Sequence, residues 1–197
     1  MKVEPVVLEG EHVRLVPLDR AHAEGIAAFL DETLTLYYQK PFRNLAEARE
    51  MIEDALKAQA TGSVLAFTTI ERATGHIAGG SRFLNIRTHD GVAEIGFTYV
   101  GRAWQRTAVN TEAKLLMLTH AFETWKANRV EFKTDSLNAQ SRQALTRLGA
   151  VEEGTLRNHM LMSDGRLRHS VYFSILPDEW PNVRAKLRAR SKQGSPR

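Results

Sequence analysis

The sequence predicts a single α/β domain of the α+β kind, in which a mixed, mostly antiparallel six- to seven-stranded sheet carries helices on both faces. Strand patterns concentrate in the middle of the chain and near its C-terminal end, with helical patterns around them. One long helix lies between two strands, which favours a parallel pair at that point. The 197 residues, 43% of them apolar, are enough to bury a sizeable core.

The N-terminal part is predicted to hold one strand and two helices. Residues 8–16 alternate polar and apolar side chains, which is typical of a strand. Asp19 can cap a first helix over residues 20–30. Asn44 has the sequence context of a capping box and begins a second helix, which Gly62 ends.

The middle of the chain is predicted to form strands and one long helix. Polar turns separate three strand patterns, and the second turn carries an Asp-Gly signal. A largely apolar helix and a short strand follow, so the helix is expected to pack on the sheet. The predicted elements are strands 63–70, 76–86 and 92–100, the helix 109–126, and the strand 129–134.

The C-terminal part is predicted to form a helix, a hairpin and a tail. The helix covers residues 138–148, and the hairpin pairs residues 155–162 with 167–176 across a second Asp-Gly turn. Residues 1–180 are therefore expected to be one domain. Residues 181–197 are rich in Lys and Arg without acidic neighbours, and are expected to be a flexible basic tail.

Composition excludes several classes of protein. The absence of cysteine excludes disulfides, thiolate metal sites and a cysteine nucleophile, and fits a cytoplasmic location. No apolar run approaches the roughly 18 residues of a membrane span, and charges interrupt the N-terminal segment where a signal peptide would be apolar. The seven histidines have no metal-binding spacing, so no metal is expected.

The segment 93–114 is the most informative for function. It reads as a strand, a loop and a helix N-terminus, where free backbone N–H groups and the helix dipole favour an anion. Arg106 adds a positive charge, and Thr107, Asn110 and Thr111 add hydrogen-bond donors. A pyrophosphate fits this environment, although many strand–loop–helix units with an arginine bind nothing.

Several motifs together resemble the GCN5-related N-acetyltransferases (GNAT), and most closely the branch that contains the ribosomal-protein alanine acetyltransferases. The acetyl-CoA loop of that family reads Gln/Arg, two residues, Gly, one residue, Gly/Ala, and falls here on Gln105–Asn110. Other similar segments, in the same order as in the family, are Thr111–Lys114, Asn138–Ser141, Leu148–Ala150 and Glu153–Arg157.

The resemblance implies acetyl-CoA as co-substrate. In the family the fourth strand splays from the fifth, and pantetheine lies between them. Ala108 and Asn110 replace the small family residues, and their Cβ atoms are expected to hold the loop slightly farther from the pyrophosphate. The implied cofactor-binding residues are Thr98, Tyr99, Val100, Gln105, Arg106, Thr107, Ala108, Val109, Asn110, Thr111, Asn138 and Ser141.

The implied chemistry is transfer of an acetyl group to an amine, which must lose a proton before it attacks. Glu94 is the candidate base, through a water, and Ser141 can donate to the leaving sulfur. Each also has a structural interpretation, as a salt-bridged strand residue and as a helix-surface hydroxyl. Glu112 fits a helix-terminus acid better than a catalytic one. Residues expected to line the acceptor side are Tyr37, Tyr38, Phe83 and Trp104.

The acceptor is expected to be a primary amine, either a protein N-terminus or a small molecule, and the resemblance makes a homodimer a reasonable expectation. Two other classes of function stay open. The replaced glycines favour a CoA-binding regulator without turnover. The basic tail allows an RNA- or ribosome-associated module, although it lacks the interleaved aromatic residues of a nucleic-acid platform.

Overall fold

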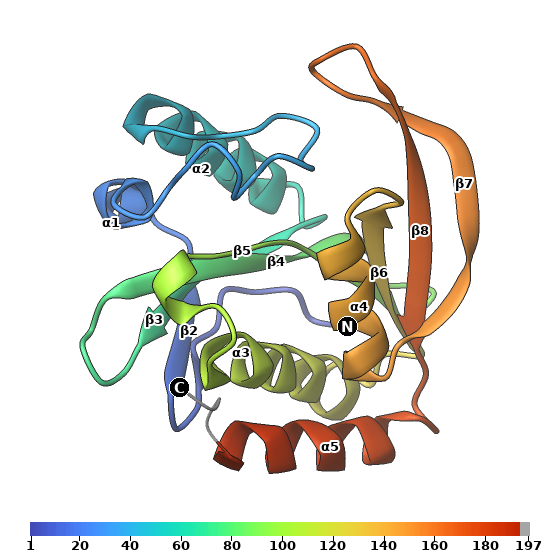
Figure 1. The fold of residues 1–197 in the computed structure, drawn as a ribbon. Coiled ribbons are helices and arrows are strands. Elements are labelled where there is room, and N and C mark those ends of the chain that lie inside the picture. The colour runs from blue at the N-terminus through green and yellow to red at the C-terminus, as the bar shows by residue number, and fades with distance from the viewer. Residues whose placement is uncertain (194–197) are drawn as a thin grey trace.

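The computed structural model describes residues 1–193 and contains one mixed sheet of eight strands in the order β1-β2-β3-β4-β5-β6-β8-β7 (Figure 1). Every neighbouring pair is antiparallel except β5 and β6, which are parallel, so the predicted mixed, mostly antiparallel sheet is confirmed, with eight strands instead of six or seven. The strands are β1 (Leu8–Glu9), β2 (Val13–Pro17), β3 (Leu65–Glu71), β4 (Ile77–Arg87), β5 (Val92–Val100), β6 (Arg129–Asp135), β7 (Val151–Leu161) and β8 (Leu167–Ile175).

Helices cover both faces of the sheet, as predicted (Figure 1). One core cluster joins α1 and α2 to the sheet, and a larger one joins α3, α4 and α5 to it on the other face. The helices are α1 (Ala23–Ala27), α2 (Leu45–Ala60), α3 (Ala108–Thr119), α4 (Ala139–Leu148) and α5 (Trp180–Gln193). A π-type turn at residues 120–124 continues α3.

The helix ends follow the capping residues that the sequence contains. The Asn44 side chain accepts a hydrogen bond from the backbone N–H of Glu47 at 3.0 Å and begins α2 as predicted. Asp19 caps a short 3-10 helix, and α1 follows only over Ala23–Ala27, so the predicted helix 20–30 is broken into two shorter pieces. Gly149 ends α4 in the left-handed conformation with φ 101°.

The basic tail is where the fold differs most from expectation. Residues 180–193 form α5, which packs along α3 and buries Val183 and Leu187 in the larger core cluster. The Trp180 ring stacks on Phe122 with 5.4 Å between ring centroids. The prediction of a flexible tail is therefore wrong for residues 181–193, because three apolar side chains on one helical face anchor the basic helix. Residues 194–197 lie outside the described part.

Two β-bulges shape the centre of the sheet. The register between β4 and β5 shifts twice, and Asn85 (φ 47°) and Phe97 (φ 49°) take positive φ values at these shifts. On β5, Ile95 packs in the α3 cluster, whereas Tyr99 packs in the α2 cluster. Residues four apart in a regular strand share a face, so the extra residue at Phe97 inverts the alternation along β5.

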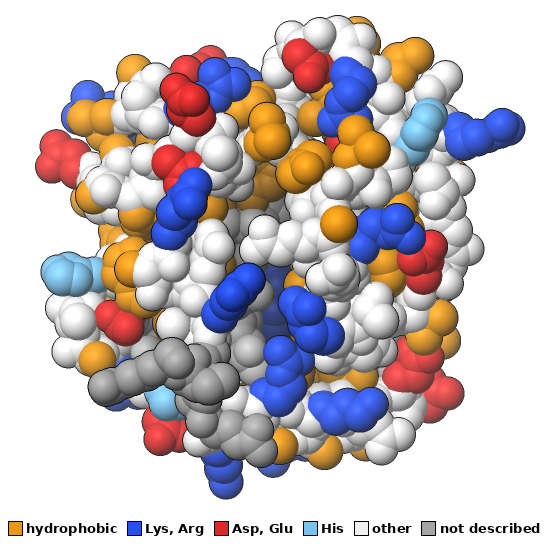
Figure 2. Space-filling view, viewed as in Figure 1, with side chains coloured by type: hydrophobic (Ala, Val, Ile, Leu, Met, Phe, Trp, Pro, Cys, Tyr) orange, Lys and Arg blue, Asp and Glu red, His pale blue; other side chains and the backbone are white. Residues whose placement is uncertain are grey.

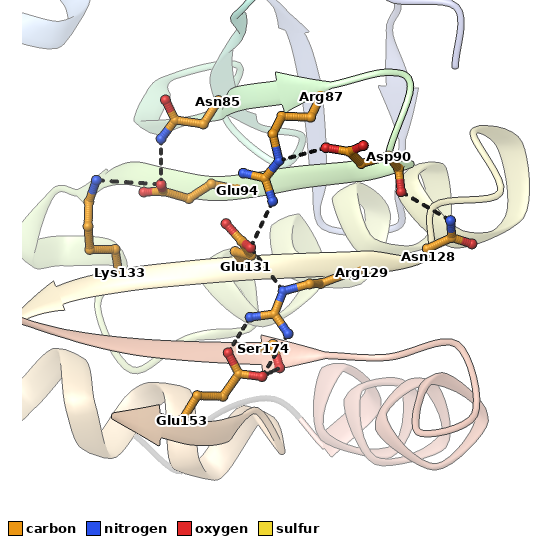
Figure 3. Close-up of polar contacts among 10 residues, drawn as sticks. All are labelled: Asn85, Arg87, Asp90, Glu94, Asn128, Arg129, Glu131, Lys133, Glu153 and Ser174. Carbon is orange, nitrogen blue, oxygen red and sulfur yellow. Dashed lines mark hydrogen bonds and ion pairs between the residues drawn. The ribbon is translucent and has the colours of Figure 1, made fainter. Parts of the chain in front are cut away.

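A row of ion pairs fastens four strands at one end of the sheet (Figure 3). Arg87 on β4 binds Glu131 on β6 at 3.2 Å, and Arg129 binds the same carboxylate at 2.9 Å. Arg129 also pairs with Glu153 on β7, whose carboxylate accepts from the Ser174 hydroxyl at 2.8 Å. These carboxylates raise the pKa of Arg129 above its usual value. The row holds β5 and β6 together at the end where their pairing begins.

Candidate active site

The two parallel strands separate in the middle of the sheet. β5 pairs with β6 only from Val92 to Glu94, opposite Arg129 to Glu131. Beyond this point β5 pairs with β4 alone, although both β5 and β6 continue for several residues. The family resemblance implies such a separation of neighbouring strands, and here it leaves a gap that begins beyond Glu94.

Glu94 is a buried carboxylate at the point of separation, with 3% of the residue exposed. Its Oε2 accepts a hydrogen bond from Asn85 Nδ2 at 2.8 Å and lies 3.5 Å from Lys133 Nζ (Figure 3). The β4 bulge turns Asn85 toward the carboxylate, and Asn tolerates the left-handed backbone there. A Cβ atom on Gly96 would come within 3.1 Å of Oε1, so the missing side chain leaves room beside that oxygen.

Aromatic packing holds the second bulge in place. The Phe97 ring stacks on Tyr38 with 4.7 Å between centroids, and the Arg82 guanidinium lies 3.7 Å from the centre of the Phe97 ring. Tyr38 donates its hydroxyl to the Thr98 carbonyl at 2.6 Å, and burial raises the pKa of Tyr38. Tyr38 is half-buried and hydrogen-bonded to β5. Its side chain therefore supports β5 where this strand leaves β6.

Backbone groups beyond the bulge face different ways. The Tyr99 carbonyl is turned toward β4, since a Cβ on Gly79 would lie 2.1 Å from it. Thr98 and Val100, the neighbours of Tyr99, therefore direct their backbone groups away from β4. Their carbonyls already accept from Tyr38 and from Gln105 Nε2, the latter at 3.0 Å. The N–H groups of Thr98 and Val100 are the better candidates for ligand contact.

The N-terminus of α3 lies next to this gap. Thr107 is the N-cap residue, and its Oγ1 accepts from the Val109 N–H at 3.2 Å. Ala108 and Asn110 are in the first helical turn and have no positive φ. The left-handed residue of the loop is Arg106, with φ 62°. Neither replaced position therefore requires glycine for its backbone conformation.

The loop and first turn of α3 also carry the polar groups that an anion needs. Arg106 is exposed, and the first-turn N–H groups have no intrahelical acceptor. Asn110 Oδ1 is a buried acceptor without a hydrogen-bond donor among the described residues, so this atom does not serve an anion. A hollow of about 390 Å³ next to this turn is lined by Glu11, His12, Glu71, Arg72, Ala73, Thr107, Ala108 and Val109.

Positive side chains surround the entrance. Figure 2 shows a hollow near the middle of the face, in the region between β5 and α4 of Figure 1, with Lys and Arg side chains gathered around it. On the α4 side of the gap, Asn138 caps the helix and its Oδ1 accepts from the Ser141 N–H at 2.9 Å. Asn138 is therefore the N-cap residue of α4. Ser141 lies next to it and is half-buried.

A roof lies over the far end of the groove. The loop between α1 and α2 meets the tip of the β7–β8 hairpin, where the Ser163 N–H donates to the Gln39 carbonyl at 3.2 Å and Gln39 Nε2 donates to the Leu161 carbonyl at 3.1 Å. From β8, Arg168 donates to the Tyr37 carbonyl at 3.3 Å. Tyr37 is therefore part of this roof.

Two predicted site residues lie elsewhere. Phe83 is fully buried, and its ring packs 4.6 Å from that of Trp125, centroid to centroid. It pairs with Ile95 on the α3 face of the sheet, so its assignment to the acceptor side is corrected to a core position. Trp104 packs edge-on against Phe29 with 6.0 Å between centroids.

Glu112 has a structural role. The residue is 5% exposed, and its carboxylate accepts three backbone hydrogen bonds. The donors are the N–H groups of Glu11 at 2.9 Å, His12 at 2.6 Å and Val13 at 2.7 Å. This carboxylate therefore fastens the start of β2 to α3 and is not available as a base.

Sequence reasoning missed three cationic residues near the site. Lys133 follows Glu131 by two positions and precedes Asp135 by two, a period that could have placed all three on one sheet face. Arg168 lies three positions before the core residue Val171, so strand alternation could have placed it on the opposite face of the sheet. Lys114 lies within the apolar helix, and helical periodicity does not predict which residues of other elements it contacts. Its Nζ donates to Thr98 Oγ1 at 2.6 Å and to Ser81 Oγ at 3.2 Å.

Within residues 1–193 no group of three or more His, Cys, Asp and Glu side chains could hold a metal ion. Over the same residues no helix has the length and apolar character needed to cross a membrane.

Comparison with known proteins gives consistent results. Residues 12–151 match the Acetyltransferase (GNAT) domain family. An uncharacterized N-acetyltransferase p20 from Bacillus licheniformis is 29% identical over 151 residues, which cover 76% of this chain and 84% of that protein. A GCN5-related N-acetyltransferase from Brucella melitensis superimposes with a TM-score of 0.88 at 31% identity, covering 94% and 85% of the two chains. A ribosomal-protein-S5-alanine acetyltransferase from Vibrio fischeri shares the fold, with a TM-score of 0.67 at 17% identity, covering 89% and 98%.

Proposed function

Because the chain belongs to the GNAT acetyltransferase family, we propose that it moves the acetyl group of acetyl-CoA to a primary amine by direct attack, with Glu94 as the base. The observation that carries this assignment is the position of Glu94, buried where β5 and β6 separate. Asn85 and Lys133 hold one carboxylate oxygen, and the space beside Gly96 lies next to the other.

The residues present fit acetyl-CoA. The N-terminus of α3 and the exposed Arg106 suit a pyrophosphate. The N–H groups of Thr98 and Val100 suit the pantetheine arm and the acetyl carbonyl. When bound, acetyl-CoA supplies an acetyl thioester. Ser141 lies on the α4 side of the gap, from which its hydroxyl would donate to the departing sulfur.

Glu94 receives the proton that the amine must lose. A protonated amine has no free electron pair, so attack requires a base, here Glu94 acting through a water. The charge of Lys133 at 3.5 Å and the Asn85 hydrogen bond orient the carboxylate while it accepts that proton. The roof formed by the hairpin tip and the α1–α2 loop limits access of bulk water to this end of the groove.

The variant Glu94→Gln tests the assignment of the base. It retains an oxygen that Asn85 can bind but removes the basic group, so kcat/KM is expected to fall by about 100-fold or more. Release of free CoA thiol with a panel of primary amines measures this effect. Glu152→Gln, the same exchange at an exposed position on β7, is the matched control and is expected to leave turnover unchanged. A fully active Glu94→Gln variant would rule out Glu94 as the base.

The variant Arg106→Ala tests the anion site. Removing one charge-assisted contact is expected to weaken acetyl-CoA binding about 10-fold, measured by isothermal titration calorimetry. Alanine keeps the Cβ, so the left-handed backbone is strained equally in both proteins. Arg102→Ala is the control in the same loop, because Arg102 already pairs with Asp31 at 2.6 Å.

The titration separates this function from the alternatives. Binding of acetyl-CoA without transfer to any amine would indicate a regulator, and no binding at millimolar ligand would overturn the proposal. A protein N-terminus is one candidate acceptor, supported by the name of the Vibrio fischeri relative in fold. We further propose a cytoplasmic homodimer; a sequence without cysteine supports the location, and sedimentation tests the dimer.

A further inference from the structure

Arg168 is a buried cation without a carboxylate partner of its own. The residue is 7% exposed, and its Nε is buried without a hydrogen-bond partner among the described residues. The neighbouring acids have other partners, since Asp135 pairs with Arg166 at 2.6 Å and Glu94 with Lys133 at 3.5 Å. Within residues 1–193 the guanidinium of Arg168 donates to one acceptor, the carbonyl of Tyr37. Leaving a buried guanidinium in this state is costly.

Arg168 lies on the same face of the sheet as Glu94. Along β8, Val171 and Phe173 point into the α3 core, so Arg168, Ser170 and Tyr172 point to the opposite face. Ser170 is paired with Asp135 and Tyr172 with Lys133 in the register of β6 and β8. Glu94 and Arg168 therefore lie on one face of the sheet, and Arg168 reaches the α1–α2 loop through its hydrogen bond to Tyr37.

The charges around Arg168 favour a single negative charge on the ligand. Burial lowers the pKa of Arg168, and the fields of Asp135 and Glu94 oppose that shift while Arg166 adds to it. A dianionic phosphate would be repelled by both nearby acids. A carboxylate carries one charge, and its two oxygens match the planar donors of arginine.

We propose that Arg168 binds a carboxylate of the acceptor, so that the acceptor is an amine with a carboxylate several bonds away. The inference rests on the proposed acetyl transfer and names the substrate class for the same site. β6 lies between β5, which carries Glu94, and β8, which carries Arg168. In the register Glu94 lies opposite Glu131, and Glu131 opposite Ser174, which is six residues from Arg168 along β8. An amine at Glu94 and a carboxylate at Arg168 therefore belong to opposite ends of an extended acceptor.

The test uses matched acceptors with wild-type protein and Arg168→Gln. One series compares ω-amino acids, from 3-aminopropanoate to 6-aminohexanoate, with their amides. A second compares peptides that begin Ala-Glu with peptides that begin Ala-Gln, which separates a small-molecule acceptor from a peptide one. The wild-type protein is expected to prefer one carboxylate series by about 10-fold or more in kcat/KM, and Arg168→Gln to lose about 100-fold on it, mainly through KM.

Controls keep the outcomes distinct. The amides carry no charge for Arg168 to bind, so Arg168→Gln is expected to change their turnover less than about threefold. The variant is also expected to leave acetyl-CoA affinity unchanged. Arg157→Gln, at an exposed position on β7, is expected to behave as wild type. If Arg168→Gln does not fold, the preference of the wild-type protein for carboxylate acceptors over their amides tests the inference by itself. Equal turnover of acids and amides overturns this inference only, whereas turnover of no amine overturns the proposed function and this inference with it.

Discussion

Replacing Glu112 with alanine is expected to lower the free energy of unfolding by about 4 kcal/mol. The carboxylate accepts three backbone N–H groups at the start of β2, and one of these hydrogen bonds is fully buried. Alanine would leave those donors without an acceptor, and each such group costs about 1–3 kcal/mol. Chemical denaturation at pH 7 measures the loss.

Graded variants separate the carboxylate from the simple loss of side-chain volume. Glu112→Gln keeps one acceptor oxygen but adds an amide donor facing other donors, so its loss is expected to lie between that of wild type and alanine. Glu50→Ala on α2 removes a carboxylate that is paired at the surface with Lys40, and is expected to cost less than about 1 kcal/mol. Equal losses for the alanine variants at positions 112 and 50 would contradict the structural role.

Raising the pH from 7 toward 10 is expected to stabilise the protein through Lys114. Burial lowers the pKa of this lysine from 10.5 to about 7. Below pH 7 both the folded and the unfolded chain hold the proton, so the stability cost of the buried charge is present in full. Between the two pKa values only the unfolded chain binds the proton, and the free energy of unfolding rises by up to about 1.4 kcal/mol per pH unit.

Lys114→Met is expected to remove this rise. Methionine has a similar length and no charge, and Ser81 and Thr98 still bond to each other at 2.8 Å. The variant is expected to exceed wild type in stability most at pH 7 and to lose about 4 kcal/mol of that advantage by pH 10.5. Denaturation at a series of pH values measures the difference, with the exposed Lys57→Met as control. Parallel pH profiles for Lys114→Met and wild type would contradict the assignment.

The sequence was sufficient for elements whose signals are local. Asn44 begins α2 where its capping pattern predicts, and the β5–α3–β6 order produces the parallel pair. The strand predicted over residues 8–16 becomes β1 and β2, because Gly10 interrupts it, and β7 begins at Val151 rather than residue 155. Glu94 was predicted to be either a base or a salt-bridged strand residue, and the structure has it buried beside Lys133.

The remaining features depend on contacts between distant segments. Phe83 was misplaced because its surroundings, which include Trp125 at 4.6 Å between ring centroids, come from segments far away in the sequence. The helix α5 was missed because Trp180, Val183 and Leu187 are few among many Lys and Arg residues, and only the surface of α3 gives them a partner. The roles of Glu112 and Lys114 depend on segments that meet only in the folded chain.

The left-handed backbone of Arg106 has a consequence for how this loop can change. Glycine at this position would relieve backbone strain and stabilise the protein by up to about 1 kcal/mol. The same exchange would delete the positive charge that we propose binds the pyrophosphate. Selection for thermal stability alone would therefore accept Arg106→Gly, and selection for cofactor retention would reverse it. Position 106 is thus a site where heat tolerance and cofactor affinity are in direct conflict, with one side chain deciding between them.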